Sequence, residues 1–135
     1  MTETTRGRDA RLMRFTILTE DDDGESHYVD ADLELFARAF VPPAPPMYVS
    51  EPVAAAHGVF FEIPAGWFGD WHPAPCRQYY VQTTGELEVQ VSDGEIRHFL
   101  PGDVVLVEDV RGTGHTTRVV SDDAVRGVYV QLPDE

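Results

Sequence analysis

Glycine-centred turns divide the second half of this chain into short segments of strand-forming residues. The breaks stand at Gly85, at Asp93-Gly94 and at Pro101-Gly102, and the residues between them are rich in Val, Tyr, Phe and Thr. Short strands at regular spacing, joined by such turns, are typical of β-sandwiches and β-barrels. The sequence therefore predicts an all-β fold.

The first half of the chain has weaker signals. Residues 14–18 indicate a short strand, and residues 19–26 indicate an acidic turn. Residues 27–35 alternate apolar with polar side chains, as a half-buried strand does, although residues 33–40 also contain one apolar helical face. Five prolines within residues 41–52 exclude a helix or a central strand there. We expect that segment to run extended along the surface or across the mouth of a barrel.

The charge of the chain limits its partners. The 135 residues carry a formal net charge of −14, with no lysine. Because phosphates are bound through Lys and Arg, this charge argues against nucleic acids and anionic membranes as partners. Residues 1–14 contain four arginines, and such a leader could contact RNA or a protein, but it is more typical of a disordered terminus. We expect a disordered leader over residues 1–14 and a single domain over residues 15–135.

Cysteine content and hydropathy favour a cytoplasmic protein. The only cysteine, Cys76, has no partner for an internal disulfide. No apolar run approaches the roughly 18 residues of a membrane span, and the N-terminus has no apolar block of a signal peptide.

One histidine stands in a group of residues with a characteristic spacing. Five residues separate Gly66 from His72, and six residues separate Gln78 from Gly85. This spacing resembles the first motif of the cupins, which are small β-barrels that hold a metal or a ligand inside. The motif also contains a second histidine and a glutamate, and Ala74 and Gln78 stand at those two positions.

The second cupin motif has a counterpart further along the chain. Gly102 begins it, and Gly112-Thr-Gly-His115 supplies its closing glycine and histidine after two additional residues. Glu108 and Val119 replace the proline and the asparagine of the motif. The resemblance covers roughly residues 58–132. It implies a cupin-type jelly-roll β-barrel, also called a double-stranded β-helix.

The resemblance also implies a metal site at the matched positions, formed by His72, Gln78 and His115. Two imidazoles are good ligands for Zn, Fe, Ni, Mn or Cu, whereas a carboxamide oxygen is neutral and weak. Glu108 or Asp109 could supply the missing carboxylate if the loop before His115 folds inward. We therefore expect a divalent metal to be weakly bound or absent.

His72 and His115 are also candidate catalytic residues, because their motif positions point into one cavity and imidazole can transfer protons without a metal. Asp109 is a third candidate, since its carboxylate could accept the other N–H of His115 and fix the tautomer of that ring. The alternatives are a purely structural histidine pair, and a turn that Glu108 and Asp109 merely cap.

Strand alternation predicts further walls of the cavity. If Gln78 faces inward, Tyr80 and Gln82 face inward with it, and Thr117 shares the face of His115. One of two adjacent phenylalanines on the preceding strand must also face inward, and a neighbouring tryptophan could act as a lid or as a dimer contact. The predicted ligand-binding residues are therefore Gln78, Tyr80, Gln82, Thr117, Phe61 and Trp71.

Such a cavity suits a mainly apolar small molecule that carries a few oxygens. Two kinds of function remain open. The first is an enzyme of the isomerase, cyclase or lyase type that uses the two histidines with or without a metal. The second is a non-catalytic small-molecule-binding or sensor protein that has lost its metal site. We also expect a homodimer, because such barrels leave sheet edges that a second subunit covers, and residues 28–40 could extend a partner's sheet.

Overall fold

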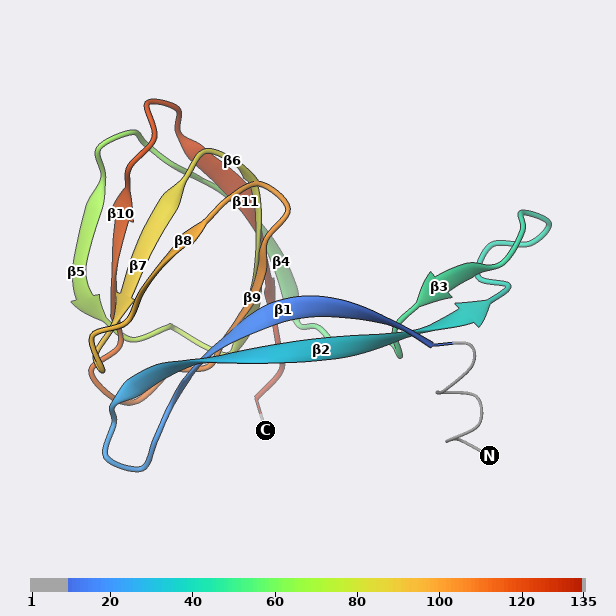
Figure 1. The fold of residues 1–135 in the computed structure, drawn as a ribbon, viewed down its shortest axis with the longest axis horizontal. Coiled ribbons are helices and arrows are strands. Elements are labelled where there is room, and N and C mark those ends of the chain that lie inside the picture. The colour runs from blue at the N-terminus through green and yellow to red at the C-terminus, as the bar shows by residue number, and fades with distance from the viewer. Residues whose placement is uncertain (1–9, 135) are drawn as a thin grey trace. The chain divides into compact units, whose positions relative to one another are not determined.

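The structure, a computed structural model, describes residues 10–134, which form eleven β-strands and no helix (Figure 1). The all-β prediction is confirmed. By their contacts, residues 16–29 and 54–134 form a larger compact unit, and residues 10–15 and 30–53 form a smaller one. The strands are β1 (Ala10–Glu20), β2 (Ser26–Arg38), β3 (Met47–Val49), β4 (His57–Ile63), β5 (Phe68–His72), β6 (Gln78–Thr84), β7 (Leu87–Val91), β8 (Ile96–Phe99), β9 (Val104–Val107), β10 (His115–Val119) and β11 (Val125–Gln131).

Eight strands of the larger unit form a two-sheet jelly roll. Strands β9, β6, β11 and β4 lie side by side in one sheet, and β5, β10, β7 and β8 lie side by side in the other (Figure 1). The chain changes sheet at every connection from β4 to β7, forms the β7–β8 hairpin within one sheet, and then alternates again to β11. This order is that of a jelly roll. The fold that the resemblance to cupins implies is therefore confirmed.

Alternating side chains fill the space between the two sheets. Along β6 and β7 every second residue is buried until the last residues of β6, as expected for strands with one face on a core. Val91 and Val125 are completely buried, and burial of such a side chain stabilises the fold by about 1.5–3 kcal/mol. Tyr28 reaches into the same core and donates a hydrogen bond to the carbonyl oxygen of Val89 at 2.7 Å. Residues 16–18 of β1 add a parallel strand beside β9.

The smaller unit is built from the remaining parts of β1 and β2 with β3. Strand β3 pairs antiparallel with the end of β2, and Phe36 lies opposite Val49. Arg38 forms an ion pair with Glu51 at 2.8 Å. Of the two interpretations of the apolar pattern in this region, the strand is therefore correct and the helix is not. The proline-rich segment contains turns and the short strand β3, without a helix.

Strand β1 begins inside the segment that we predicted as a disordered leader. Residues 1–9 of that leader lie outside the described residues, whereas residues 10–14 belong to β1. Strand β1 is hydrogen-bonded to β2, and composition alone does not reveal such a pairing because it depends on a partner further along the chain.

His27, on β2, connects two acidic turns of the larger unit. Its Nδ1 lies 2.8 Å from Oδ2 of Asp93, and its Nε2 lies 3.0 Å from Oδ2 of Asp21. The hydrogen bonds with Asp21 and Asp93 raise the pKa of His27. The hydrogen bond with His27 lowers the pKa of Asp21. The pKa of Asp93 is lowered most by the hydrogen bond from the backbone N–H of Glu95, and next by the hydrogen bond with His27. This arrangement favours the imidazolium between two carboxylates.

We expect this contact to stabilise the fold only within a window of pH. Because the pKa of His27 is raised above 6.5, its contribution is complete below that pH and is lost as the pH rises through the folded-state pKa. Because the pKa values of Asp21 and Asp93 are lowered below 3.8, their contribution is present above that pH and is lost as the pH falls through the folded-state values. The free energy of unfolding should therefore differ more between the parent and His27→Gln near pH 5 than near pH 9 in urea denaturation.

Asp22→Asn, in the same turn but outside the contact, is the control variant and should show no such dependence on pH. A His27→Gln effect of equal size at both pH values would contradict the prediction.

Candidate functional site

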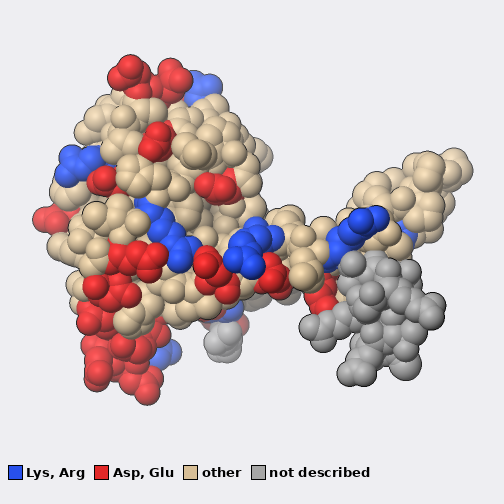
Figure 2. All heavy atoms as spheres, viewed as in Figure 1, with Lys and Arg blue, Asp and Glu red and all other residues tan. Residues whose placement is uncertain are grey.

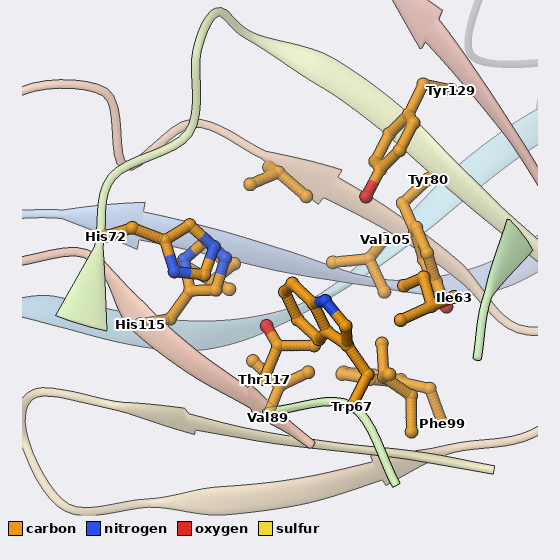
Figure 3. A pocket seen from close by; sticks show the side chains of 13 residues that line it. Ile63, Trp67, His72, Tyr80, Val89, Phe99, Val105, His115, Thr117 and Tyr129 are labelled. Carbon is orange, nitrogen blue, oxygen red and sulfur yellow. The ribbon is translucent and has the colours of Figure 1, made fainter. Parts of the chain in front are cut away.

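A cavity of about 90 Å³ lies between the two sheets of the jelly roll (Figure 3). Its lining comes entirely from the larger unit and includes no Asp, Glu, Lys or Arg. Leu, Ile, Val, Phe and Trp side chains form most of the wall. The more polar lining residues are His72, His115, Thr117, Tyr80 and Tyr129. A cavity of this composition suits a mainly apolar molecule with a few polar atoms.

His72 and His115 face each other across two neighbouring strands. Strands β5 and β10 pair antiparallel with these two residues in register, and the centroids of their rings lie 4.6 Å apart. The pairing becomes irregular between His115 and Thr117, where β5 contributes an additional residue. Both rings line the cavity, as the motif positions predict.

Asp109 holds His115 in place from the loop between β9 and β10. Its Oδ2 lies 2.6 Å from Nδ1 of His115, so the hydrogen bond that the sequence predicts is present. The side chain of Asp109 is completely buried, and its Oδ1 has no hydrogen-bond partner among residues 10–134. A buried carboxylate that loses its hydrogen-bond partner keeps its desolvation penalty. We therefore expect loss of the Asp109–His115 contact to lower the free energy of unfolding by about 3–5 kcal/mol.

Residues near the start of the chain anchor the same loop. The carboxylate of Glu20 accepts hydrogen bonds from the backbone N–H groups of Arg111, at 3.0 Å, and Gly112, at 2.8 Å. The hydroxyl of Ser26 donates to the carbonyl oxygen of Gly114 at 2.6 Å. The loop is therefore held at both ends of its turn by residues of β1 and β2 that lie in the larger unit.

Gly114 brings this loop against the strand that carries His72. Its φ is +81°, and a Cβ at this position would lie 2.0 Å from the carbonyl oxygen of His72. A side chain here would therefore both strain the backbone and force the loop away from β5. Gly114, which directly precedes His115, permits the approach of the two histidines.

The hydrogen bonds at Nδ1 determine which nitrogen of each histidine can act in the cavity. Nδ1 of His72 lies 2.6 Å from the backbone oxygen of Asp70, and because a carbonyl only accepts, Nδ1 carries the proton. The carboxylate of Asp109 imposes the same tautomer on His115. Neither Nε2 is hydrogen-bonded to a residue of the described part of the chain. In the neutral rings both Nε2 atoms therefore present lone pairs.

The residues around the two histidines do not form a set of metal ligands. Among residues 10–134, no three His, Cys, Asp or Glu side chains lie close enough to hold a metal ion. Gln78, the third residue of the predicted metal set, does not line the cavity, and its Oε1 accepts a hydrogen bond from Gln131 at 3.2 Å. Glu108 pairs instead with Arg77 at 3.0 Å, and neither residue lines the cavity. Two imidazoles alone do not fit the three protein ligands that are typical of a catalytic zinc.

Only some of the predicted ligand-binding residues reach the cavity. Tyr80 and Thr117 line it, as strand alternation predicts. Gln82 also faces inward, but its side chain is engaged: it accepts a hydrogen bond from the hydroxyl of Tyr80 at 2.7 Å and donates to the carbonyl oxygen of Phe99 at 2.8 Å. Phe61 stacks on the ring of Tyr80, with a centroid distance of 5.4 Å, and does not line the cavity. Gln82 and Phe61 therefore support the wall from behind.

The tryptophan at the cavity is Trp67, whereas Trp71 is 44% exposed and does not line it. Gly69 leaves room for the indole of Trp67, because a Cβ at Gly69 would lie 2.5 Å from that ring. Alternation could not distinguish the two tryptophans, since β5 carries the irregularity described above. Sequence reasoning also missed Tyr129, because no motif residue in β11 indicates which of its faces points inward.

Acidic side chains gather on the surface around the β1–β2 turn (Figure 2), where Asp21, Asp22, Asp23 and Glu25 are exposed. Together with the net charge of −14, they create a potential that disfavours the approach of anions. Residues 10–134 include no helix with the length and apolar character needed to cross a lipid bilayer.

No protein-family model and no curated protein matches this chain. The similar solved structures include a conserved protein of unknown function, SPY1581, from Streptococcus pyogenes, with 16% identity, coverage of 65% of this chain and 72% of that chain, and a TM-score of 0.43. They also include the cupin domain of Cnp3 from Schizosaccharomyces pombe, with 16% identity, coverage of 94% of this chain and 86% of that chain, and a TM-score of 0.49. The assignment of the jelly-roll fold rests on the strand order of this chain.

Proposed function

We propose that the jelly roll binds a small, uncharged and mainly apolar molecule, and that His72 and His115 transfer protons to and from that molecule. The observation that carries this proposal is the pair of imidazoles in one apolar cavity, each with Nδ1 already hydrogen-bonded and Nε2 available. The Nε2 lone pairs of His72 and His115 can accept a hydrogen bond or a proton, and a ligand hydroxyl or an acidic C–H supplies it.

The absence of charged side chains from the cavity lining argues for an uncharged ligand. A carboxylate or phosphate would lose its hydration without gaining a cationic partner among the lining residues. The acidic surface around the β1–β2 turn also opposes the approach of an anion. The same surface supports the proposal that neither nucleic acids nor anionic membranes are partners, and retention of the protein on heparin at moderate salt would contradict it.

The two histidines are not equivalent as bases. When a ring takes a proton at Nε2 it becomes an imidazolium, and His115 gains the stabilisation of the buried carboxylate of Asp109 at 2.6 Å. His72 has only the carbonyl oxygen of Asp70 behind it. In the proposed reaction Nε2 of His115 removes a proton from the ligand, and the proton returns to another ligand atom from His115 itself or after its transfer to Nε2 of His72. This exchange requires no external oxidant or reductant and suits an isomerase, a cyclase or a lyase.

Asparagine substitutions test the role of Nε2 in ligand binding. The amide N–H of Asn can occupy the position of Nδ1, so that His72→Asn and His115→Asn keep a donor for Asp70 and Asp109 while removing Nε2. We expect the double variant to bind cyclohexanol at least about tenfold more weakly, equivalent to about 1.4 kcal/mol, in isothermal titration calorimetry. The two single effects should not add, because both rings serve one site.

Methylcyclohexane, which has a similar ring and no hydroxyl, is the matched control ligand. Its affinity should change by less than about twofold in the same variants, because it makes no hydrogen bond. Equal weakening of both ligands would indicate a damaged cavity and would contradict the proposed role of the histidines.

Turnover separates an enzyme from the alternative, a non-catalytic binding or sensor protein. With cyclohexanone in deuterated water, a proton-transferring site should accelerate exchange of the hydrogens next to the carbonyl in the parent and not in the double histidine variant, as followed by NMR. Binding of cyclohexanone without faster exchange would favour the sensor alternative.

We propose that a divalent metal binds weakly or not at all, and that a bound ion would be held through Nε2 of His72 and His115. A bound metal would supply Lewis-acid chemistry there. After dialysis against a mild chelator, elemental analysis should find clearly less than one zinc ion per chain. Ala74→His with Gln78→Glu should raise retention towards one ion, because both donors of the cupin motif return.

His72→Asn added to that double variant is the control and should abolish the retention. Stoichiometric zinc in the parent protein would overturn this proposal, because it would show that other residues complete the metal site.

We also propose a homodimer that forms in the cytoplasm, where Cys76 would stay reduced. Part of the segment 28–40 is already paired with β3, and we propose instead an edge of the larger unit, β4, which is the last strand of its sheet in the described chain. Phe60 on β4 is 84% exposed, and a second copy would cover it.

Light scattering at micromolar concentration should give twice the chain mass of 15.1 kDa for the parent. Phe60→Ser should shift the protein towards the monomer, whereas Ile96→Ser on β8, which is 48% exposed, is the matched control and should not. A monomeric parent would rule the dimer out.

A further inference from the structure

The hydroxyl of Tyr129 is a hydrogen-bond donor in the cavity lining that the proposed proton transfer does not use, as are the hydroxyl of Thr117 and the indole N–H of Trp67. Of the two tyrosines in the lining, Tyr80 donates its hydroxyl hydrogen to Gln82 at 2.7 Å and is therefore engaged. The hydroxyl of Tyr129 makes no hydrogen bond to any group among residues 10–134. This hydroxyl is therefore available to donate a hydrogen bond to a ligand or a water in the cavity.

The position of the Tyr129 ring is fixed by its aromatic neighbours. Its centroid lies 4.7 Å from that of Phe61 and 5.6 Å from that of Tyr80. Strand β11 runs between β6 and β4, and Tyr129 is in register with Tyr80 on one side and Val59 on the other. The ring therefore lies in a packed row on the sheet, and Figure 3 shows its hydroxyl pointing into the cavity.

The two sheets place this hydroxyl on the wall that faces the histidines. Tyr129 belongs to the sheet of β6, β11 and β4, whereas His72 and His115 belong to the sheet of β5 and β10. Burial raises the pKa of Tyr129, so the phenol keeps its proton at neutral pH. The sheet of β5 and β10 thus offers a ligand the Nε2 lone pairs of the two histidines. The opposite sheet offers the hydroxyl of Tyr129 as a hydrogen-bond donor.

We propose that Tyr129 is a ligand-binding residue that donates a hydrogen bond to a carbonyl oxygen, and that the ligand class of this cavity is a small uncharged ketone. The inference rests on the proposed function, because it places the ligand in the same cavity. A ketone satisfies both walls: its oxygen accepts from Tyr129, and the acidic C–H beside its carbonyl can be directed to the Nε2 atoms of the histidines. A carboxylate does not fit, since no cationic side chain lines the cavity.

Two ligands that differ only in the acceptor test this assignment. Cyclohexanone carries the carbonyl oxygen, and methylenecyclohexane has a CH₂ group in its place. In a Trp71→Phe background Trp67 is the remaining tryptophan of the chain, and its fluorescence reports occupancy of the cavity that it lines. Tyr129→Phe should weaken cyclohexanone binding about five- to tenfold and change methylenecyclohexane binding by less than about twofold.

A matched substitution and a spectroscopic measurement complete the test. Tyr79→Phe, on the opposite face of β6, should leave the affinity for both ligands unchanged. In the parent, the carbonyl stretching band of bound cyclohexanone should lie at lower wavenumber than in Tyr129→Phe, because the hydrogen bond weakens the C=O bond. This comparison detects the contact even if the variant alters affinity through packing.

The possible outcomes separate the two proposals. If both ligands bind the parent and neither affinity depends on the Tyr129 hydroxyl, the ketone assignment fails while small-molecule binding in the cavity stands. Equal weakening of both ligands with an unshifted carbonyl band also overturns the assignment. If neither ligand binds the parent, the proposed function fails and the assignment fails with it.

Discussion

Asp109 has no solvent-exposed surface and one oxygen without a partner among residues 10–134, so its hydrogen bond with Nδ1 of His115 is the main compensation for burying a carboxylate. That bond also orients the imidazole and assigns its tautomer. The loop that carries Asp109 is itself held by Glu20 and Ser26, and Gly114 lets it approach β5. The geometry of the site therefore depends on one buried contact and on the loop that supplies it.

The jelly roll places His115, which this contact orients, in a cavity lined by both sheets. Because its two sheets face each other, residues far apart in the chain project into one space from opposite walls: the histidines from β5 and β10, and Tyr129 from β11. Apolar side chains separate the two walls and exclude charge. Such an arrangement selects for size and for the placement of a donor and an acceptor, which is why a small, uncharged and mainly apolar ligand with a few polar atoms is the class proposed.

Much of this framework was predictable from the sequence. The turn glycines and the strand-forming residues between them predict the all-β fold, and the resemblance of the spacings around His72 and His115 to the cupin motifs implies that both rings enter one cavity. Alternation correctly places Tyr80 and Thr117 on the inner face, because a strand turns successive side chains to opposite sides wherever its pairing is regular. These features depend on local spacing, which the sequence carries directly.

By itself the sequence therefore determined the fold class, the histidine pair and the inward face of β6. Only the tertiary structure decided which inward groups remain available. Gln82 faces inward but is engaged by neighbouring groups, Trp67 replaces Trp71 because β5 is irregular, and Tyr129 has a hydroxyl without a partner among residues 10–134. The physical reason is that alternation assigns a side to each residue, whereas hydrogen-bond partners come from segments distant in the chain, and only their packing determines which polar atoms are satisfied.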